Sequence, residues 1–193
     1  MLPYQNIFFL MTLAVPAFIF ILQLAKREII RKAIKSAFWV VVVVIFGYWS
    51  YIVYLQYQAF ASGPLGTTLG TIDGLQWFFG YTRLHFWNQH LVSFIAALGI
   101  FALAKYLNKK RGEIFMEPEE IYLGGLGVFL VGYPGFLFYL PLVLIASIVV
   151  SLMFVRRGER LPLYHFWMPT AIVVLLVIQF WADGQDWWAT FRF

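Results

Sequence analysis

Glu113–Val155 reads EIFMEPEEIYLGGLGVFLVGYPGFLFYLPLVLIASIVVSLMFV. Acidic residues and a proline open it, and an uncharged run of 35 residues from Ile121 to its end follows. About 20 apolar residues cross the hydrocarbon core of a bilayer, so this run is too long for one helix. Tyr133-Pro134-Gly135 has turn chemistry and divides the run. We expect a short helix over Pro118–Gly132 and a longer one over Phe136–Val155.

The composition places the whole chain in a membrane. Of its 193 residues, 62% are hydrophobic and 12% are charged, whereas soluble domains carry about 25% charged residues. We therefore predict an all-α, polytopic integral membrane protein, with residues 1–193 forming a single membrane domain. The chain has no cysteine, which excludes disulfides, thiolate metal sites and cysteine nucleophiles.

Six transmembrane helices are expected, with the short fourth helix at the centre. Gly124 and Gly127 lie about one turn apart on that fourth helix and permit a close backbone approach. The first apolar block lacks a preceding basic region and a cleavage site, so we do not expect a cleaved signal peptide. The spans outside the opening stretch are predicted at Ile7–Leu24, Ala37–Tyr57, Leu91–Leu107 and His165–Ala182.

The net charge of +5 comes mostly from short basic segments between the spans. Lys26–Lys35 is read as a basic loop, residues 105–111 end the third span, and Arg156–Arg160 is a basic turn. The positive-inside rule places these segments in the cytoplasm and both termini outside the cell membrane. This topology accounts for the positive charge, so we do not expect nucleic acid as a partner.

Gln58–Gln89 differs from the other connections. It starts with turn residues over Ser62–Thr68 and continues through the aromatic segment Ile72–Trp87. Trp and Tyr favour the headgroup level of a membrane. We expect an interfacial or re-entrant segment, and the sequence leaves open whether it enters the bilayer.

Two interpretations apply to the acids around Pro118. Proline at the first helical position and acids in the first turn are typical of a helix start. Alternatively, Glu119 or Glu120 acts as a general acid or base at the membrane edge. An aspartyl-type site needs two carboxylates, so the second interpretation requires a partner acid.

Residues 105–171 resemble the type IV prepilin peptidases, which are membrane aspartyl proteases of the GxGD type. The family pattern is Gly-x-Gly-Asp-x-Lys-Leu-x-Ala-Ala-Leu-Gly. In this sequence Met116 and Pro118 occupy the two glycine positions, Glu119 the aspartate position and Ile121 the lysine position. Leu123–Gly127 matches the small-residue helix that follows. The break at Tyr133-Pro134-Gly135 and the element Leu161-Pro162-Leu163 also match.

The resemblance implies a leader peptidase acting at the cytoplasmic face, with Glu119 as a catalytic carboxylate. The family's second aspartate ends an earlier helix, where this chain reads Tyr54–Gln58 without an acid. Asp73, the one acid between Glu28 and Glu113, is the remaining candidate. The longer Glu119 side chain shifts the carboxylate by roughly an ångström, which can cost ~100-fold in rate. We therefore expect weak or absent peptidase activity.

The alternative hypothesis is a non-catalytic membrane subunit or scaffold. It would bind partner membrane proteins through the glycine face of the fourth helix or through Ile72–Trp87. A second carboxylate within reach of Glu119 would favour the peptidase. Acids confined to the turn that carries Glu119 would favour the scaffold.

The sequence predicts no cofactor and no metal site. His85 and His90 lie five residues apart, which is poor spacing for a shared metal. Asp183 and Asp186, flanked by tryptophans, resemble an interfacial tail. The middle of each predicted span contains no ionisable side chain, which argues against coupled ion transport. The expected partners are the lipid bilayer, a leader peptide and other membrane proteins.

Overall fold

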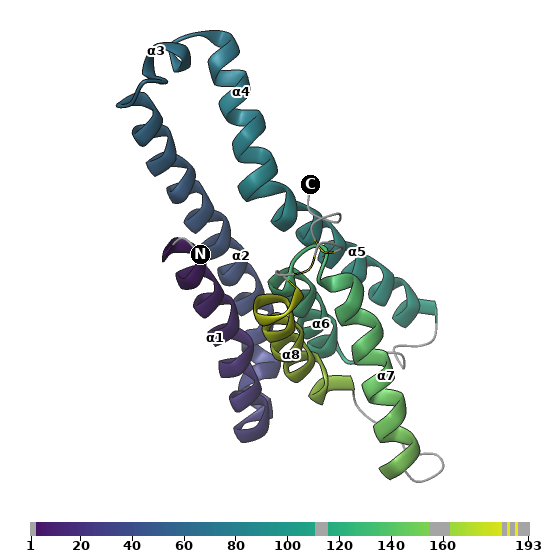
Figure 1. Cartoon of the computed structure of the whole chain (residues 1–193). Helices are drawn as coiled ribbons and strands as arrows, with labels where there is room; N and C mark the ends of the chain where they lie inside the picture. The colour runs from purple at the N-terminus through teal and green to yellow at the C-terminus, as the bar shows by residue number, and fades with distance from the viewer. Residues whose placement is uncertain (1–2, 111–115, 155–162, 183–184, 186–187, 189–193) are drawn as a thin grey trace.

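The computed structural model describes residues 3–110, 116–154, 163–182, 185 and 188, and this part of the chain contains helices and turns without strands (Figure 1). The all-α prediction is therefore confirmed for these residues. The helices are α1 (Pro3–Ala25), α2 (Arg27–Ala61), α3 (Gly66–Leu69), α4 (Ile72–Thr82), the π-helix η1 (Arg83–Trp87), α5 (Asn88–Lys110), α6 (Pro118–Val131), α7 (Phe136–Phe154), the 3₁₀-helix η2 (Leu163–His165) and α8 (Trp167–Phe180).

Five helical segments of the described chain are long and apolar enough to cross a membrane. They are α1, α2, the 39-residue run from α4 through α5, α7, and the run of η2 with α8. These segments support a membrane-spanning protein. The short helix predicted as the fourth span, α6, has 14 residues and is not among these five. At 1.5 Å per residue it is about 21 Å long, less than the ~30 Å of a hydrocarbon core.

The short helix α6 is central, as predicted. It packs against α1, α2, α5, α7 and α8. From Glu119 to Val131 all of its residues are buried except Tyr122, which is half-buried. Gly132 ends the helix with φ +75°, in the left-handed region that glycine adopts without strain. The predicted break at 133–135 separates α6 from α7.

The prediction of a basic loop over Lys26–Lys35 is wrong. Only Lys26 is non-helical, and α2 begins at Arg27 and continues for 35 residues. The segment contains Arg, Lys, Glu and Ile, of which the first three are strong helix formers. The basic residues therefore form the first turns of α2 and not a loop.

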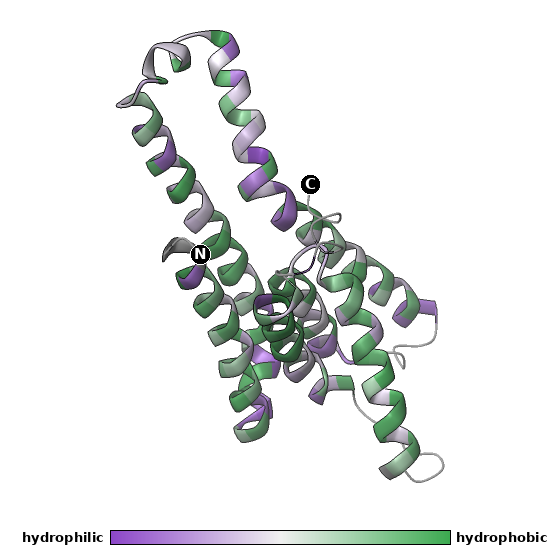
Figure 2. Ribbon diagram, in the orientation of Figure 1, coloured by the Kyte–Doolittle hydropathy of each residue, from purple (hydrophilic) through white to green (hydrophobic). Residues whose placement is uncertain are grey.

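Gln58–Gln89 is mainly helical and not a loop, and its interfacial or re-entrant position in a bilayer stays a prediction. Helix α2 continues to Ala61, and after the turn containing α3 the helix resumes at Ile72 and runs into α5. Residues 50–87 form a helical hairpin that projects beyond the other helices (Figure 1); we call it the arm. Hydropathy is mixed along α4, whereas α1 and α7 are largely apolar (Figure 2).

Aromatic contacts hold the two sides of the arm together. The ring of Tyr57 on α2 lies 5.6 Å from that of Phe78 on α4, measured between centroids. Phe60 contacts Trp77 and Phe78 at 6.1 and 5.9 Å. The Gln56 side-chain amide donates a hydrogen bond of 3.2 Å to the Tyr81 hydroxyl. Because these contacts join α2 directly to α4, the arm is a packed hairpin.

Candidate functional site

The first turn of α6 is fixed by Glu120, which lies three residues after Glu117 at the N-terminal cap. The backbone N–H of Glu117 donates to Glu120 Oε2 at 3.0 Å. The backbone N–H of Tyr164, in η2, donates to Glu120 Oε1 at 2.8 Å. One buried carboxylate therefore satisfies two N–H groups and ties the start of α6 to the segment before α8. This is the capping role that the acids around Pro118 predict.

Glu119 is buried, with 3% of its side chain exposed, and it faces two arginines of α2. Its Oε1 lies 3.5 Å from Arg27 Nη2 and its Oε2 lies 4.0 Å from Arg31 Nε. Oε2 has no hydrogen-bond partner in the described structure. Arg27 and Arg31 are four residues apart and so lie on one face of the helix. Burial of a charge is tolerated when an opposite charge compensates it, and these arginines supply that compensation.

Arg27 also connects α2 to the start of α6 and to η2, and Gln23 connects α1 to η2. Its guanidinium donates a hydrogen bond to Glu117 Oε2, and its central carbon lies 5.0 Å from the centroid of the Tyr164 ring. The Gln23 side-chain amide, on α1, donates to the Tyr164 carbonyl oxygen at 2.8 Å. We call this set the arginine–glutamate cluster; it consists of Gln23, Arg27, Arg31, Glu117, Glu119, Glu120 and Tyr164.

The acids that the described residues bring to this cluster come from one turn of α6, namely Glu117, Glu119 and Glu120. Asp73 is distant from them. It lies 35 residues before Asn108 in the continuous helical run, which corresponds to about 50 Å. Asn108 in turn hydrogen-bonds the backbone of Met116 at the start of this turn. The structure therefore does not bring Asp73 and Glu119 together.

Geometry of this kind favours a structural role for the cluster. An aspartyl-type site uses two carboxylates that share a proton and activate water. Here the candidate carboxylate is buried beside Arg27 and Arg31, which occupy the space on that side. No protein-family model, curated protein or solved structure matches this chain. The geometry of the described residues is therefore the basis for any functional conclusion.

The glycine face of α6 is occupied from within the protein. A Cβ on Gly125 would lie 2.1 Å from Cε1 of Phe101, and a Cβ on Gly127 would lie 2.0 Å from the Tyr139 hydroxyl oxygen. A Cβ on Gly124 would lie 3.1 Å from the Trp167 ring. These glycines admit aromatic side chains of α5, α7 and α8. The face predicted as a partner surface is thus an internal packing surface.

The described histidines do not converge on a common site. His90 is buried between Phe8 and Trp49, with ring centroids 5.1 and 5.5 Å away. His85 stacks on Tyr81 at 4.2 Å within the arm, and its Nδ1 lies 2.9 Å from the Tyr81 carbonyl oxygen. No group of three metal-ligating side chains occurs among the described residues. Asp183 and Asp186 lie outside the described residues.

Sequence reasoning located Glu119 but missed its partners. The sequence predicts Arg27 and Arg31 in a basic loop, and no pattern marks Gln23 or Tyr164 as site residues. The one local signal is the i, i+4 spacing of the two arginines, which places them on one face once the segment is known to be helical. Their contact with Glu119 joins residues about 90 positions apart, which no local pattern reports.

Proposed function

We propose that this chain is a non-catalytic membrane protein that binds other membrane proteins, built on a scaffold resembling the prepilin peptidases. The observation that carries the proposal is the arginine–glutamate cluster, in which Glu119 is paired with Arg27 and Arg31. Its neighbouring carboxylates share its own turn and are tied to an arginine and to backbone N–H groups. The cluster therefore anchors α6 to α2 and η2, and among the described residues no second carboxylate is free to form a water-activating dyad with Glu119.

The arm supplies the partner surface. About 20 residues cross the hydrocarbon core, and counting back that far from Lys105 reaches His85. On this basis α4 extends beyond the hydrocarbon. Ile72 and Phe79 are seven residues apart, share a helix face, and are exposed by 76% and 65%. Exposed apolar patches mark sites of protein or membrane contact, and α4 presents one at the end of a packed hairpin.

We assign the basic ends of α2 and α5 to the cytoplasm and the arm to the opposite side, following the positive-inside rule. Both termini lie on the side of the arm in this topology. A cysteine at Ser62, in the exposed turn of the arm, should react with an impermeant thiol reagent applied from outside. A cysteine at the exposed Lys110 should be protected. The opposite labelling pattern would refute the orientation.

A photoreactive amino acid placed at Phe79 in living cells tests the partner surface. The expected result is a discrete adduct with an integral membrane protein. The matched control places the same group at Val149 on α7, which is also exposed but lies within a predicted span, and should give lipid adducts. Lipid adducts at both positions would show that α4 contacts the membrane and would overturn the proposed surface.

A second candidate function, the leader peptidase, is favoured by one observation. Glu119 occupies the aspartate position of the resembling motif and is a buried carboxylate at the predicted membrane edge. In that case Glu119→Gln would abolish leader cleavage in cells that depend on this protein. Unchanged processing in the Glu119→Gln variant would eliminate this candidate.

A further inference from the structure

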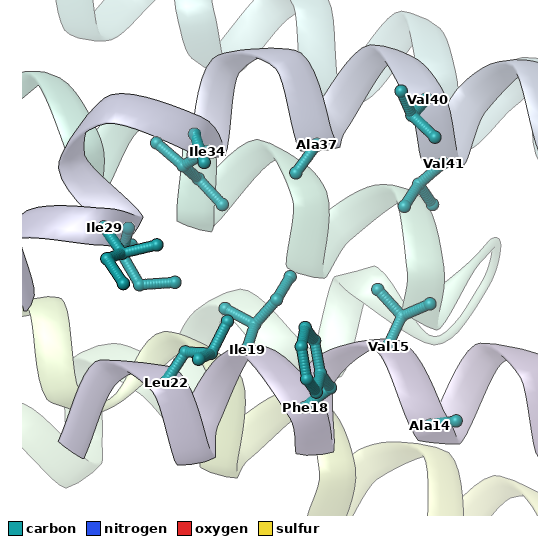
Figure 3. A pocket seen from close by; sticks show the side chains of 12 residues that line it. Ala14, Val15, Phe18, Ile19, Leu22, Ile29, Ile34, Ala37, Val40 and Val41 are labelled. Carbon is teal, nitrogen blue, oxygen red and sulfur yellow. The ribbon is translucent and has the colours of Figure 1, made fainter. Parts of the chain in front are cut away.

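A groove of about 430 Å³ lies between α1 and α2, next to the turn at Lys26. Figure 3 shows side chains of the two helices facing each other across it. All of its lining is aliphatic or aromatic, and three alanines create the space: Ala14 on α1, and Ala33 and Ala37 on α2. Phe18 and Val40 on its rim are exposed. The groove therefore opens outward at the level of the predicted bilayer.

The dimensions of the groove favour a lipid chain over a protein helix. An α-helix with its side chains is about 10–12 Å across, so a 20 Å segment of one displaces on the order of 1,500 Å³. The groove, of about 430 Å³, is too small to enclose such a segment. A flexible hydrocarbon chain needs no polar contact, and the lining of the groove provides none.

Positive charge lies at one end of the groove. Lys26 is the residue between α1 and α2, and Lys32 lies one turn after the lining residue Ile29, on the adjacent helix surface. Both lysines are exposed, and neither forms an ion pair with the described acids. Helix α2 also starts without a side-chain cap, so the positive end of its dipole faces the same region.

We propose that this groove binds an anionic phospholipid, with an acyl chain between α1 and α2 and the phosphate headgroup at Lys26 and Lys32. Basic residues at the end of an apolar cleft between membrane helices complement such a headgroup. The site is separate from the arm, so this inference does not depend on the proposed function. It also holds for either orientation of the chain in the membrane, because both bilayer surfaces can present anionic lipids.

Lipid titration of the purified full-length chain in detergent tests the charge contribution. Native mass spectrometry would compare phosphatidylglycerol with phosphatidylcholine carrying the same acyl chains. A lysine near an anionic headgroup contributes ~1 kcal/mol, which is about fivefold in affinity. Wild type should therefore prefer phosphatidylglycerol by roughly thirtyfold, and Lys26→Gln/Lys32→Gln should bind both lipids alike.

Lys35→Gln is the matched control. Lys35 is exposed, and at 100° per residue it lies on the opposite side of α2 from the lining residues. Its loss should leave the preference unchanged. Equal binding of the two lipids by wild type would overturn the proposal. So would an equal loss of preference in Lys35→Gln, which would indicate attraction to the general positive charge of the chain.

Filling the groove tests where the acyl chain lies. Ala33→Phe and, from the opposite helix, Ala14→Phe should remove the bound lipid of either headgroup. Retained selective binding in a folded variant would contradict the proposed position. If both variants unfold, photo-cross-linking tests the position in the wild-type protein, with a phosphatidylglycerol that carries a photoreactive group in its acyl chain. Adducts should concentrate in residues 14–22 and 29–41, and an even distribution over the lipid-facing helices would refute the site.

Discussion

The packing of α6 on α7 can be tested at Gly127. In the Gly127→Ala variant the new Cβ would lie 2.0 Å from the Tyr139 hydroxyl oxygen and 2.5 Å from its Cζ, whereas ordinary contacts are about 3.5–4.0 Å. Tyr139 has no exposed surface, and its hydroxyl donates to the Trp167 carbonyl oxygen at 3.0 Å. The ring must move and lose this bond. Overpacking costs about 1–3 kcal/mol and a membrane hydrogen bond about 0.6 kcal/mol on average, so we expect a loss of roughly 2–4 kcal/mol.

The assay is reversible unfolding in mixed micelles, followed by circular dichroism. Gly99→Ala is the matched control because its added Cβ would meet nothing within 4 Å apart from its own stretch of helix backbone, and we expect it to be neutral or stabilising. The Gly127→Ala/Tyr139→Phe double variant should lose less than the sum of the single losses, since removal of the hydroxyl makes room for the methyl group. If Gly127→Ala were as stable as Gly99→Ala, the close packing of these helices would be wrong.

Three further predictions concern the cluster and the arm. Glu120→Ala removes the acceptor of two N–H groups and should lower the free energy of unfolding by about 1–3 kcal/mol. A change below ~0.5 kcal/mol in the same unfolding assay would refute the proposed link between the start of α6 and η2 through Glu120. Arg27→Gln should lower the melting temperature in detergent more than the double variant Arg27→Gln/Glu119→Gln does, because the single variant leaves the buried Glu119 carboxylate without this partner. The reverse order of melting temperatures would contradict the ion pair. With the photoreactive group moved to the exposed Ile72, Phe79→Ala should weaken partner cross-linking at least tenfold with little effect on stability. The buried neighbour Phe78, changed to Ala, should instead cost about 3–5 kcal/mol of stability, and equal effects of the two variants on cross-linking would contradict the surface.

Much of the fold follows from the sequence because apolar length and turn residues act locally. Pro118 and the 133–135 break fixed the bounds of α6 to within one residue of the prediction. Hydropathy does not predict the backbone of a polar segment, because it reports the solvent that the side chains prefer and not whether the backbone is helical. This is why the sequence predicts a loop over Lys26–Lys35 and a turn-led interfacial or re-entrant segment over Gln58–Gln89, although both are largely helical.

The candidate site was predictable only in part. Glu119 and the capping acids were found because helix starts have a local signature around Pro118. The arginine partners come from α2, and their contact depends on the tertiary packing of that helix against α6. The glycine face shows the same limit: small residues at Gly124 and Gly127 indicate close packing, but the sequence does not distinguish an internal partner from an external one.

The central claim is that Glu119 stabilises the fold and does not cleave peptide bonds. The most direct measurement is cleavage of a prepilin leader substrate by the purified protein in liposomes, comparing wild type with Glu119→Gln, alongside the unfolding midpoint of each. We predict no cleavage by either protein. We also predict a lower unfolding midpoint in the variant, because the ion pairs with Arg27 and Arg31 are lost. Cleavage by wild type that disappears in Glu119→Gln, with an unchanged midpoint, would contradict the claim.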